Sequence, residues 1–253
     1  MVTLATPQRL VLAKRALEAF CAQTHATREL LIVTDPGAKA GLETMAAALG
    51  RDDIRIIEAN RAAPLGALRN IARDNARGDV HCQWDDDDLH HPERLERQLA
   101  VLTARSAQAV CLQEVMQFFP AERALYRTNW RATEAGVFPG SLMCRANAPA
   151  RYPETGPAAR LGEDLDVVAQ LRKGGRLHAL ADAPHLYVYV SHGANSWPDD
   201  HHRMLADRLA VSPGLLRRHE PQLRQGLMPF DFGPGVVTVR GPAGPAFTID
   251  VED

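Results

Sequence analysis

Four consecutive aspartates, Asp85 to Asp88, stand in the stretch HCQWDDDDLHHPERLERQL, which runs from His81 to Leu99. They follow a short apolar segment that is typical of a strand. Charged side chains are rarely buried without partners, and in water adjacent carboxylates repel one another. A bound cation would relieve this repulsion. The alternative is a solvated acidic loop that caps the helix predicted to begin at Pro92.

The acidic run has the chemistry of a site for a hard metal ion. Mg²⁺ and Mn²⁺ prefer oxygen ligands, keep several waters and often share their coordination with the phosphates of a substrate. Alternate side chains of an extended segment face the same way, so Asp85 and Asp87 could act together. The run therefore predicts a divalent cation that works with a phosphate-bearing ligand.

On the N-terminal side of this stretch, strand and helix patterns alternate. The run ELLIVTD has a continuous apolar centre, LLIV, as in a buried strand, and the Asp-Pro-Gly that begins at its last residue predicts a turn. Gly78 is expected to cap the end of the helix before the acidic run. This βαβαβ order predicts a largely parallel sheet covered by helices. The predicted strands are residues 2–6, 29–35, 54–59 and 79–84, and the predicted helices are residues 10–23, 41–49 and 65–76.

On the C-terminal side the alternation is looser. Residues 109–119, 141–146 and 185–193 have strand patterns, and residues 163–175 predict a helix with acidic residues in its first turn and Gly174 at its end. From Asp199 onward we expect two polar helices and a hairpin that turns at Pro-Ala-Gly-Pro. The predicted domains are residues 1–198, with halves 1–108 and 109–198, and an appendage of residues 199–253.

Composition narrows the class of protein. The 29 Lys and Arg residues nearly balance the 31 Asp and Glu residues, which argues against a nucleic-acid partner. The four cysteines form no CxxC pair, as expected in a reducing compartment. The sequence shows neither a signal-peptide pattern nor an apolar stretch long enough to span a bilayer. We therefore expect a cytoplasmic protein, with peripheral membrane contact and homo-oligomerisation left open.

Three further features are candidates for a functional site. In an open parallel sheet ligands bind at the carboxyl ends of strands, where both Asp35 and the acidic run are predicted to lie. The pair Glu163-Asp164 is either a set of carboxylates that favour a helix N-terminus or a general base presented by that helix. His192, after a late strand, is either a ligand or a structural residue.

The order of these motifs resembles the family 2 glycosyltransferases of the GT-A fold. The resemblance runs from Val2 to about Trp197 and rests on ATPQR, RALEAFCAQTH, LLIVTDPG, LGALRNIARDNARGDVHCQWDDDDLHHPERL, GSLMCRA and GEDLDVVAQLRKGG. It implies a GT-A-like, Rossmann-related α/β fold, with a mixed, mostly parallel sheet flanked by helices and a C-terminal helical and hairpin appendage. It also implies a metal-dependent enzyme, usually inverting, that moves a sugar from a nucleotide-sugar donor.

The resemblance also implies roles for individual residues. Asp164 would be the catalytic base, and Glu163 would support it or contact the acceptor. Mn²⁺ or Mg²⁺ would be held by Asp87, or by Asp88 if the register differs by one residue, and His192 matches a late metal or diphosphate contact. The nucleotide-sugar contacts would come from the donor half of the chain, namely from Thr6, Asp35, Arg69, Asp85 and Asp86.

Departures from the family pattern leave the nucleotide open. Ala5 replaces a proline, Thr34 replaces the first residue of an Asp-Asp pair, and Pro36 replaces a glycine. All three lie in the nucleoside-binding half, so a UDP-sugar is a default only. The acceptor, whether a glycan, a lipid-linked sugar or another hydroxyl compound, is not indicated.

Two other functions compete with this interpretation. A sugar-phosphate nucleotidyltransferase would need a glycine-rich first loop, which LATPQR lacks. A non-catalytic protein that binds nucleotide or glycan would not need the acidic run and the Glu-Asp pair, and both are intact.

Overall fold

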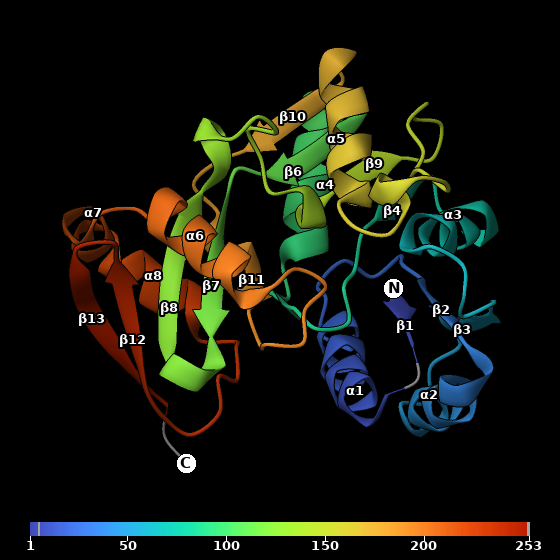
Figure 1. The fold of residues 1–253 in the computed structure, drawn as a ribbon, viewed down its shortest axis with the longest axis horizontal. Helices are drawn as coiled ribbons and strands as arrows, with labels where there is room; N and C mark the ends of the chain where they lie inside the picture. The colour runs from blue at the N-terminus through green and yellow to red at the C-terminus, as the bar shows by residue number, and fades with distance from the viewer. Residues whose placement is uncertain (5, 252–253) are drawn as a thin grey trace. The chain divides into compact units, whose positions relative to one another are not determined.

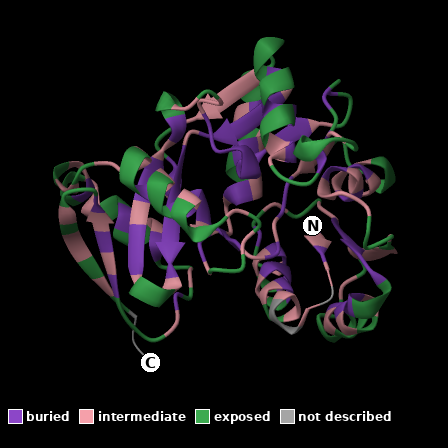
Figure 2. Ribbon diagram, viewed as in Figure 1, coloured by how far each residue is buried: buried purple, intermediate pink, exposed green. Residues whose placement is uncertain are grey.

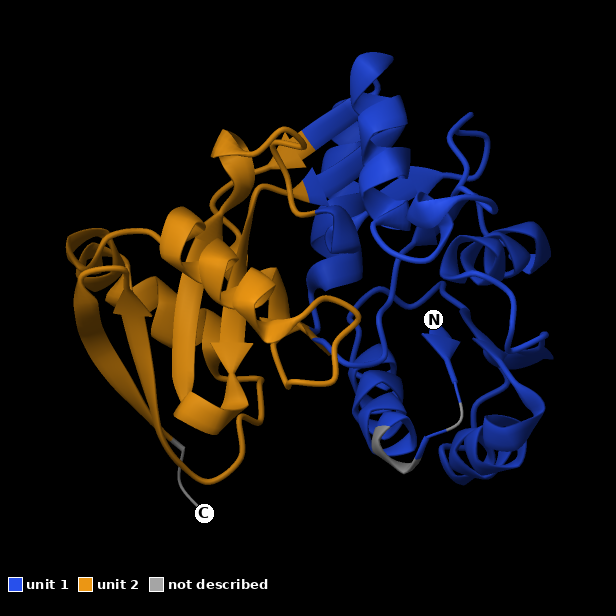
Figure 3. Ribbon diagram, viewed as in Figure 1, with its two compact units in different colours: residues 1–88, 92–111, 139–178 blue, residues 89–91, 112–138, 179–253 orange. Residues whose placement is uncertain are grey.

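The computed structural model describes residues 1–4 and 6–251, so the departure at Ala5 lies outside the described residues. The chain divides into two compact units (Figure 3). Unit 1 consists of Met1–Asp88, Pro92–Cys111 and Pro139–His178. Unit 2 consists of Leu89–His91, Leu112–Phe138 and the chain from Ala179 onward. The acidic run therefore ends where the chain first passes from unit 1 to unit 2.

Unit 1 begins with the predicted alternation of strands and helices (Figure 1). All five residues of the central strand β2 are buried, as the continuous apolar run predicted. The three strands pair in parallel in the order β1-β2-β3, with Val33 opposite Val2 and Ile57. These elements are β1 (Val2–Thr3), α1 (Pro7–Cys21), β2 (Leu30–Thr34), α2 (Pro36–Ala48), β3 (Ile54–Glu58) and α3 (Leu65–Asn75).

Several predicted helix boundaries in this region were wrong, among them those of α1, which spans Pro7–Cys21 and not residues 10–23. Helix α2 begins at Pro36 and not at residue 41, because the Asp35 side chain caps its first turn and proline suits the first helical position. Helix α3 ends at Asn75, and its C-cap is Ala76 in an extended conformation, so Gly78 does not cap it. Pro92 precedes helix α4 (Arg94–Ala104), whose N-cap is Glu93.

A second sheet continues unit 1 in the order β10-β6-β9-β4. Strand β9 is antiparallel to both of its neighbours, with Cys144 opposite His81 and Ala109. The helix predicted over residues 163–175 is present as α5, with Gly174 as its C-cap. The elements are β4 (Val80–Cys82), α4, β6 (Ala109–Leu112), β9 (Met143–Arg145), α5 (Glu163–Lys173) and β10 (Leu177–Leu180).

The single strand predicted over residues 109–119 is two strands in two sheets. Its first part, β6, pairs with β9, whereas its second part, β7 (Glu114–Phe119), pairs with β8 and β11. Gln113 lies between the two strands and belongs to neither, and its backbone N–H donates to the carbonyl of Leu180. Both halves are apolar and buried, so the hydrophobic pattern carried no sign of the break.

Unit 2 is built on a six-stranded sheet in the order β13-β12-β8-β7-β11-β5. Strand β7 is buried along its whole length (Figure 2). The predicted terminal hairpin is present, and its strand β12 pairs in parallel with β8. Three helices precede it in place of the two predicted. The elements are β5 (Leu89–His90), β7, β8 (Ala124–Asn129), β11 (Tyr187–Val190), α6 (Asp199–Leu209), α7 (Pro213–Arg218), α8 (Glu220–Leu227), β12 (Gly235–Gly241) and β13 (Gly244–Val251).

Short 3-10 helices complete the chain, at Pro120–Glu122, Trp130–Ala132, Pro139–Ser141, Pro157–Ala159 and Pro184–Leu186. Within the described residues, no helix has both the length and the apolar character needed to cross a membrane.

Trp84 anchors the chain just before the acidic run. Its indole Nε1–H donates to the carbonyl of Ala16 in α1 at 3.1 Å, and its ring meets Phe20 edge to face. On the other side the fully buried Arg94 lies 5.3 Å from the Trp84 ring centre and donates to the carbonyl of Gln83 at 2.9 Å. These contacts fix the position from which the four aspartates leave β4.

Candidate functional site

The acidic run alternates between buried and partly exposed side chains. Asp86 and Asp88 are buried, whereas Asp85 and Asp87 are partly exposed. The backbone bends at residues 86–88, so the run does not continue a strand and neighbouring carboxylates can meet the same partner.

Arg9, in the first turn of α1, joins two of these carboxylates. Its Nη1 donates to Asp86 Oδ1 at 2.6 Å and to Asp87 Oδ2 at 2.8 Å. Thr6 is the N-cap of this helix, and its hydroxyl accepts a hydrogen bond from the backbone N–H of Arg9. Arg9 is the last residue of the ATPQR motif, and neither the motif nor its spacing predicted these two contacts.

Burial dominates the electrostatics of Asp86. Removal from water raises the pKa of this carboxyl to about 7, the negative charge of Asp87 adds to the rise, and Arg9 opposes it. Burial lowers the pKa of the Arg9 guanidinium, but the negative charges of Asp87 and Asp86 outweigh this effect and raise it. Arg9 therefore serves as the counter-charge for this part of the run.

Arg69, on α3, links the acidic run to the Glu-Asp pair. Its Nη2 donates to Asp85 Oδ1 at 2.8 Å, and its Nε donates to Glu163 Oε1 at 2.7 Å. The other oxygen of Asp85 accepts from Gln83, whose side-chain oxygen accepts from the Tyr152 hydroxyl. The guanidinium thus contacts two carboxylates, whereas the family resemblance placed it against the nucleoside or diphosphate.

Asp164, the second residue of α5, is partly exposed and has a raised pKa. Burial raises the pKa of its carboxyl to about 7, and the neighbouring charge of Glu163 raises it further, while Arg69 opposes the rise. The preceding Gly162 adopts a left-handed conformation with a φ of 80°, at the start of α5. A carboxyl with a pKa near the working pH is well suited to take a proton.

Asp35 has a structural role that sequence analysis did not assign. Its Oδ1 accepts hydrogen bonds from the backbone N–H groups of Gly37 and Ala38 at 2.9 and 3.2 Å, so it caps α2. Its Oδ2 lies 3.8 Å from the Nε of Arg61. Any contact with a nucleobase would therefore be made by a carboxylate already fixed at a helix start.

The comparisons with known proteins identify the family. The sequence profile of Glycosyl transferase family 2 matches residues 8–143, which is more than half of the chain. The chain belongs to this family. The match includes Arg9, Arg69 and the acidic run. It ends before Glu163, Asp164 and His192. The family resemblance drawn from the motifs is thus confirmed.

Solved structures of glycosyltransferases share the fold. TarS from S. aureus in complex with UDP aligns with a TM-score of 0.58 and 14% identity, over 88% of this chain and 72% of that one. The mannosyltransferase PcManGT from Pyrobaculum calidifontis, in complex with GDP-Man and Mn²⁺, aligns with a TM-score of 0.57 and 16% identity, over 92% and 65%. The α/β, GT-A-like fold class is thereby confirmed. No curated protein matches the chain.

The carboxylate oxygens of the acidic run are the kind of ligand that a divalent cation such as Mg²⁺ or Mn²⁺ prefers. Among the described residues, no three side chains of His, Cys, Asp or Glu are grouped so as to hold a metal ion. Mg²⁺ is commonly bound by only one or two carboxylates together with substrate phosphates. The buried Oδ2 of Asp86 has no hydrogen-bond partner among the described residues, which leaves an acceptor within the run.

His192, the last predicted site residue, belongs to unit 2. Its backbone N–H donates to Asn195 Oδ1 at 2.9 Å, and its Nδ1 accepts from the backbone N–H of Ala194 at 3.3 Å. In a neutral ring this bond places the proton on Nε2, which makes Nε2 a hydrogen-bond donor. Metal binding through Nε2 would require the other tautomer and the loss of the bond to Ala194.

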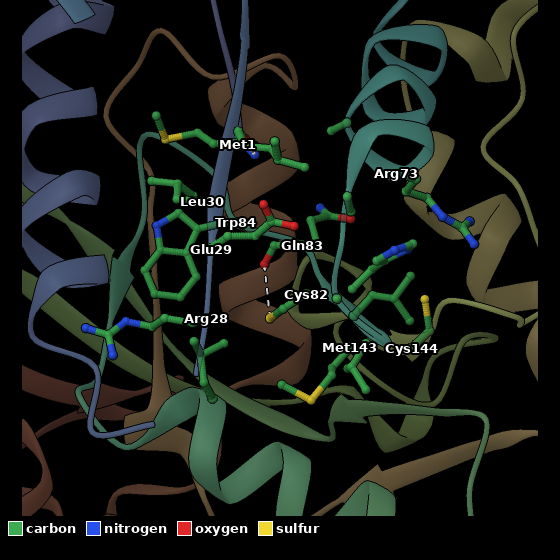
Figure 4. A pocket seen from close by; sticks show the side chains of 18 of the residues that line it. Met1, Arg28, Glu29, Leu30, Arg73, Cys82, Gln83, Trp84, Met143 and Cys144 are labelled. Carbon is green, nitrogen blue, oxygen red and sulfur yellow. Dashed lines mark hydrogen bonds between the residues drawn. The ribbon is translucent and has the colours of Figure 1, made fainter. Parts of the chain in front are cut away.

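A cavity of about 570 Å³ lies within unit 1 beside the Arg69 network. Figure 4 shows side chains of Met1, Trp84 and Met143 around it. Arg69 and Gln83 line it as well. The residues that position Asp85 therefore border a mainly apolar space.

Proposed function

We propose that this chain is a metal-dependent, inverting glycosyltransferase of the hexosyltransferase type, which moves a sugar from a nucleotide-sugar donor to an acceptor hydroxyl. The observation that carries the proposal is the link made by Arg69 between Asp85 and Glu163. It joins the carboxylate assigned to the donor sugar to the residue beside the assigned base, Asp164. Membership of glycosyl transferase family 2 supports the same reaction class.

Asp164 takes the proton of the acceptor hydroxyl in this mechanism. The oxygen then attacks the anomeric carbon from the face opposite the leaving group, so that one displacement inverts the configuration. The pKa of about 7 lets Asp164 act as a base near neutral pH. Glu163, which holds Arg69, acts as a positioning residue.

The donor is assigned to the acidic run and the neighbouring strand end. Asp35 and Thr6 are assigned to the nucleoside, and Asp85 and Asp86 to the ribose or sugar. Asp87 would hold Mn²⁺ or Mg²⁺, with Asp88 as the alternative if the register differs by one residue. When bound, the cation neutralises negative charge on the departing diphosphate.

The ligands bound in similar structures set the range of donors to test. TarS has been solved with UDP-GlcNAc, and PcManGT with GDP-Man and Mn²⁺. A UDP-sugar is our default donor, and GDP-sugars are the next choice. The acceptor hydroxyl is unassigned.

The decisive test is a panel of UDP-, GDP-, TDP- and CDP-sugars, each with Mn²⁺ or Mg²⁺. Release of nucleoside diphosphate is measured without acceptor, as slow donor hydrolysis, and again with candidate acceptors. We expect turnover with one nucleotide class and its loss in EDTA. Donor binding without turnover in every combination would overturn the proposal.

A further inference from the structure

Two carboxylates of the acidic run converge on one nitrogen atom. The Nη1 of Arg9 lies 2.6 Å from Asp86 Oδ1 and 2.8 Å from Asp87 Oδ2. The side chains of the two aspartates are 4% and 13% exposed, and that of Arg9 is 25% exposed. A positive charge therefore already lies between the carboxylates where a divalent cation is proposed.

This arrangement is stable only while a cation is present. Removing one partner of a buried ion pair leaves an uncompensated charge, which is strongly unfavourable. Arg9 is the most exposed member of the group and has a long, flexible side chain, so it is the member that can leave. It can leave only if another cation takes over the charge of Asp86 and Asp87.

We propose that Arg9 is a resident counter-cation of Asp86 and Asp87 that competes with the divalent ion for Asp87. Arg9 suppresses metal binding to the nucleotide-free protein. A bound nucleoside diphosphate offers the released guanidinium a new anionic partner. Metal and nucleotide therefore bind cooperatively, because each favours the state in which Arg9 has left the carboxylates. The inference rests on the proposed function, since it assumes a metal at the acidic run.

The test measures Mn²⁺ affinity and not activity. Free Mn²⁺ is quantified by electron paramagnetic resonance in titrations of the wild type and of Arg9→Gln without nucleotide, at low ionic strength. We expect Arg9→Gln to bind Mn²⁺ about tenfold more tightly or better, because a unit charge within a few ångströms of the ion has been removed. Adding UDP or GDP should narrow this gap.

Lys14→Gln is the matched control. It removes the same charge from the same helix, but Lys14 is exposed and lies 3.8 Å from Glu18. Surface charges are screened by water and salt, so we expect Mn²⁺ affinity to change by less than about twofold. Arg9→Lys, which keeps a cation, should stay near the wild type.

Thermal unfolding provides a second readout. It compares each protein with and without Mn²⁺, so it can be used even if Arg9→Gln is less stable than the wild type. A saturating metal raises the melting temperature according to its affinity for the folded state, so Mn²⁺ should stabilise Arg9→Gln more than the wild type. Equal or weaker Mn²⁺ binding by Arg9→Gln would overturn the inference.

Asp87→Asn separates the inference from the proposed function. Loss of Mn²⁺ binding in Asp87→Asn, with no gain in Arg9→Gln, overturns the inference alone and leaves the metal site in place. If neither the wild type nor any of these variants binds Mn²⁺, even when UDP or GDP is added, both the inference and the metal dependence are overturned. Tight binding by Arg9→Gln that is lost in the Arg9→Gln, Asp87→Asn double variant supports both.

Discussion

Replacing Asp164 with asparagine should change both the stability and the activity of the protein in a pH-dependent way. The pKa of this carboxyl is raised from 3.8 to about 7 in the folded chain. At about 1.36 kcal/mol per tenfold change in an equilibrium constant, this difference corresponds to about 4 kcal/mol. Asp164 is partly exposed, and screening by water reduces the effect, so we expect about 1–2 kcal/mol.

The sign follows from the direction of the pKa change. Because the folded pKa is raised, ionisation of Asp164 costs stability, and the cost appears as pH rises from about 4 to about 7. Asparagine cannot ionise and avoids this cost. The free energy of unfolding of Asp164→Asn relative to the wild type should therefore be higher at pH 8 than at pH 4.

Two assays check this prediction. Urea denaturation at pH 4, 6 and 8 measures the stability difference, with Asp166→Asn as the control, because Asp166 lies exposed in the same helical turn. Transfer by Asp164→Asn should fall by about 10²–10⁴-fold, and wild-type kcat/KM should rise with pH to a plateau above about 7. Parallel stability curves together with wild-type transfer rates would refute the assignment of Asp164 as the general base.

Substitutions at three other positions test the rest of the site. Asp87→Ala should abolish turnover with little change in circular dichroism. The wild type should be inactive in EDTA and regain activity when Mn²⁺ or Mg²⁺ is restored. Activity of Asp87→Ala in chelator would contradict the metal site. Arg69→Met should lower the free energy of unfolding by about 3–5 kcal/mol in urea, because Asp85 and Glu163 lose their shared partner; a loss below about 1 kcal/mol would show that the link is weak. Asp35→Ala should cost about 0.5–2 kcal/mol as a lost N-cap, whereas Asp35→Asn should keep the cap. If Asp35 also contacts the base, calorimetry with UDP, GDP, TDP and CDP should show weaker binding to Asp35→Asn, and unchanged affinity for all four would remove it from the pocket.

Local patterns in the sequence were sufficient for many of the elements. The buried strand β2 was predicted from the four adjacent apolar residues LLIV, and α5 from its acidic first turn and Gly174. Both depend on interactions between near neighbours in the chain, which periodicity and capping residues report directly. The family was predicted in the same way, because its motifs are short and occur in a defined order.

Partners of the charged residues were decided only by the tertiary structure. Arg9 meets Asp86 across 77 residues, and Arg69 meets Glu163 across 94. The periodicity of the chain carries no information about which cation lies beside which carboxylate. The break between β6 and β7 was likewise invisible, because both strands are apolar and differ only in the strands with which they pair.

The sequence by itself determined the residue types of the site and the elements that present them. Apolar strands ending in carboxylates, and a helix beginning with Glu163 and Asp164, follow from local preferences of about 1 kcal/mol or less per residue. Tertiary structure alone decided that Arg9 neutralises Asp86 and Asp87 and that Arg69 links Asp85 to Glu163. The physical reason is that the energy of a charge depends on its burial and on its nearest counter-charge, and both are set by chain segments far away in the sequence.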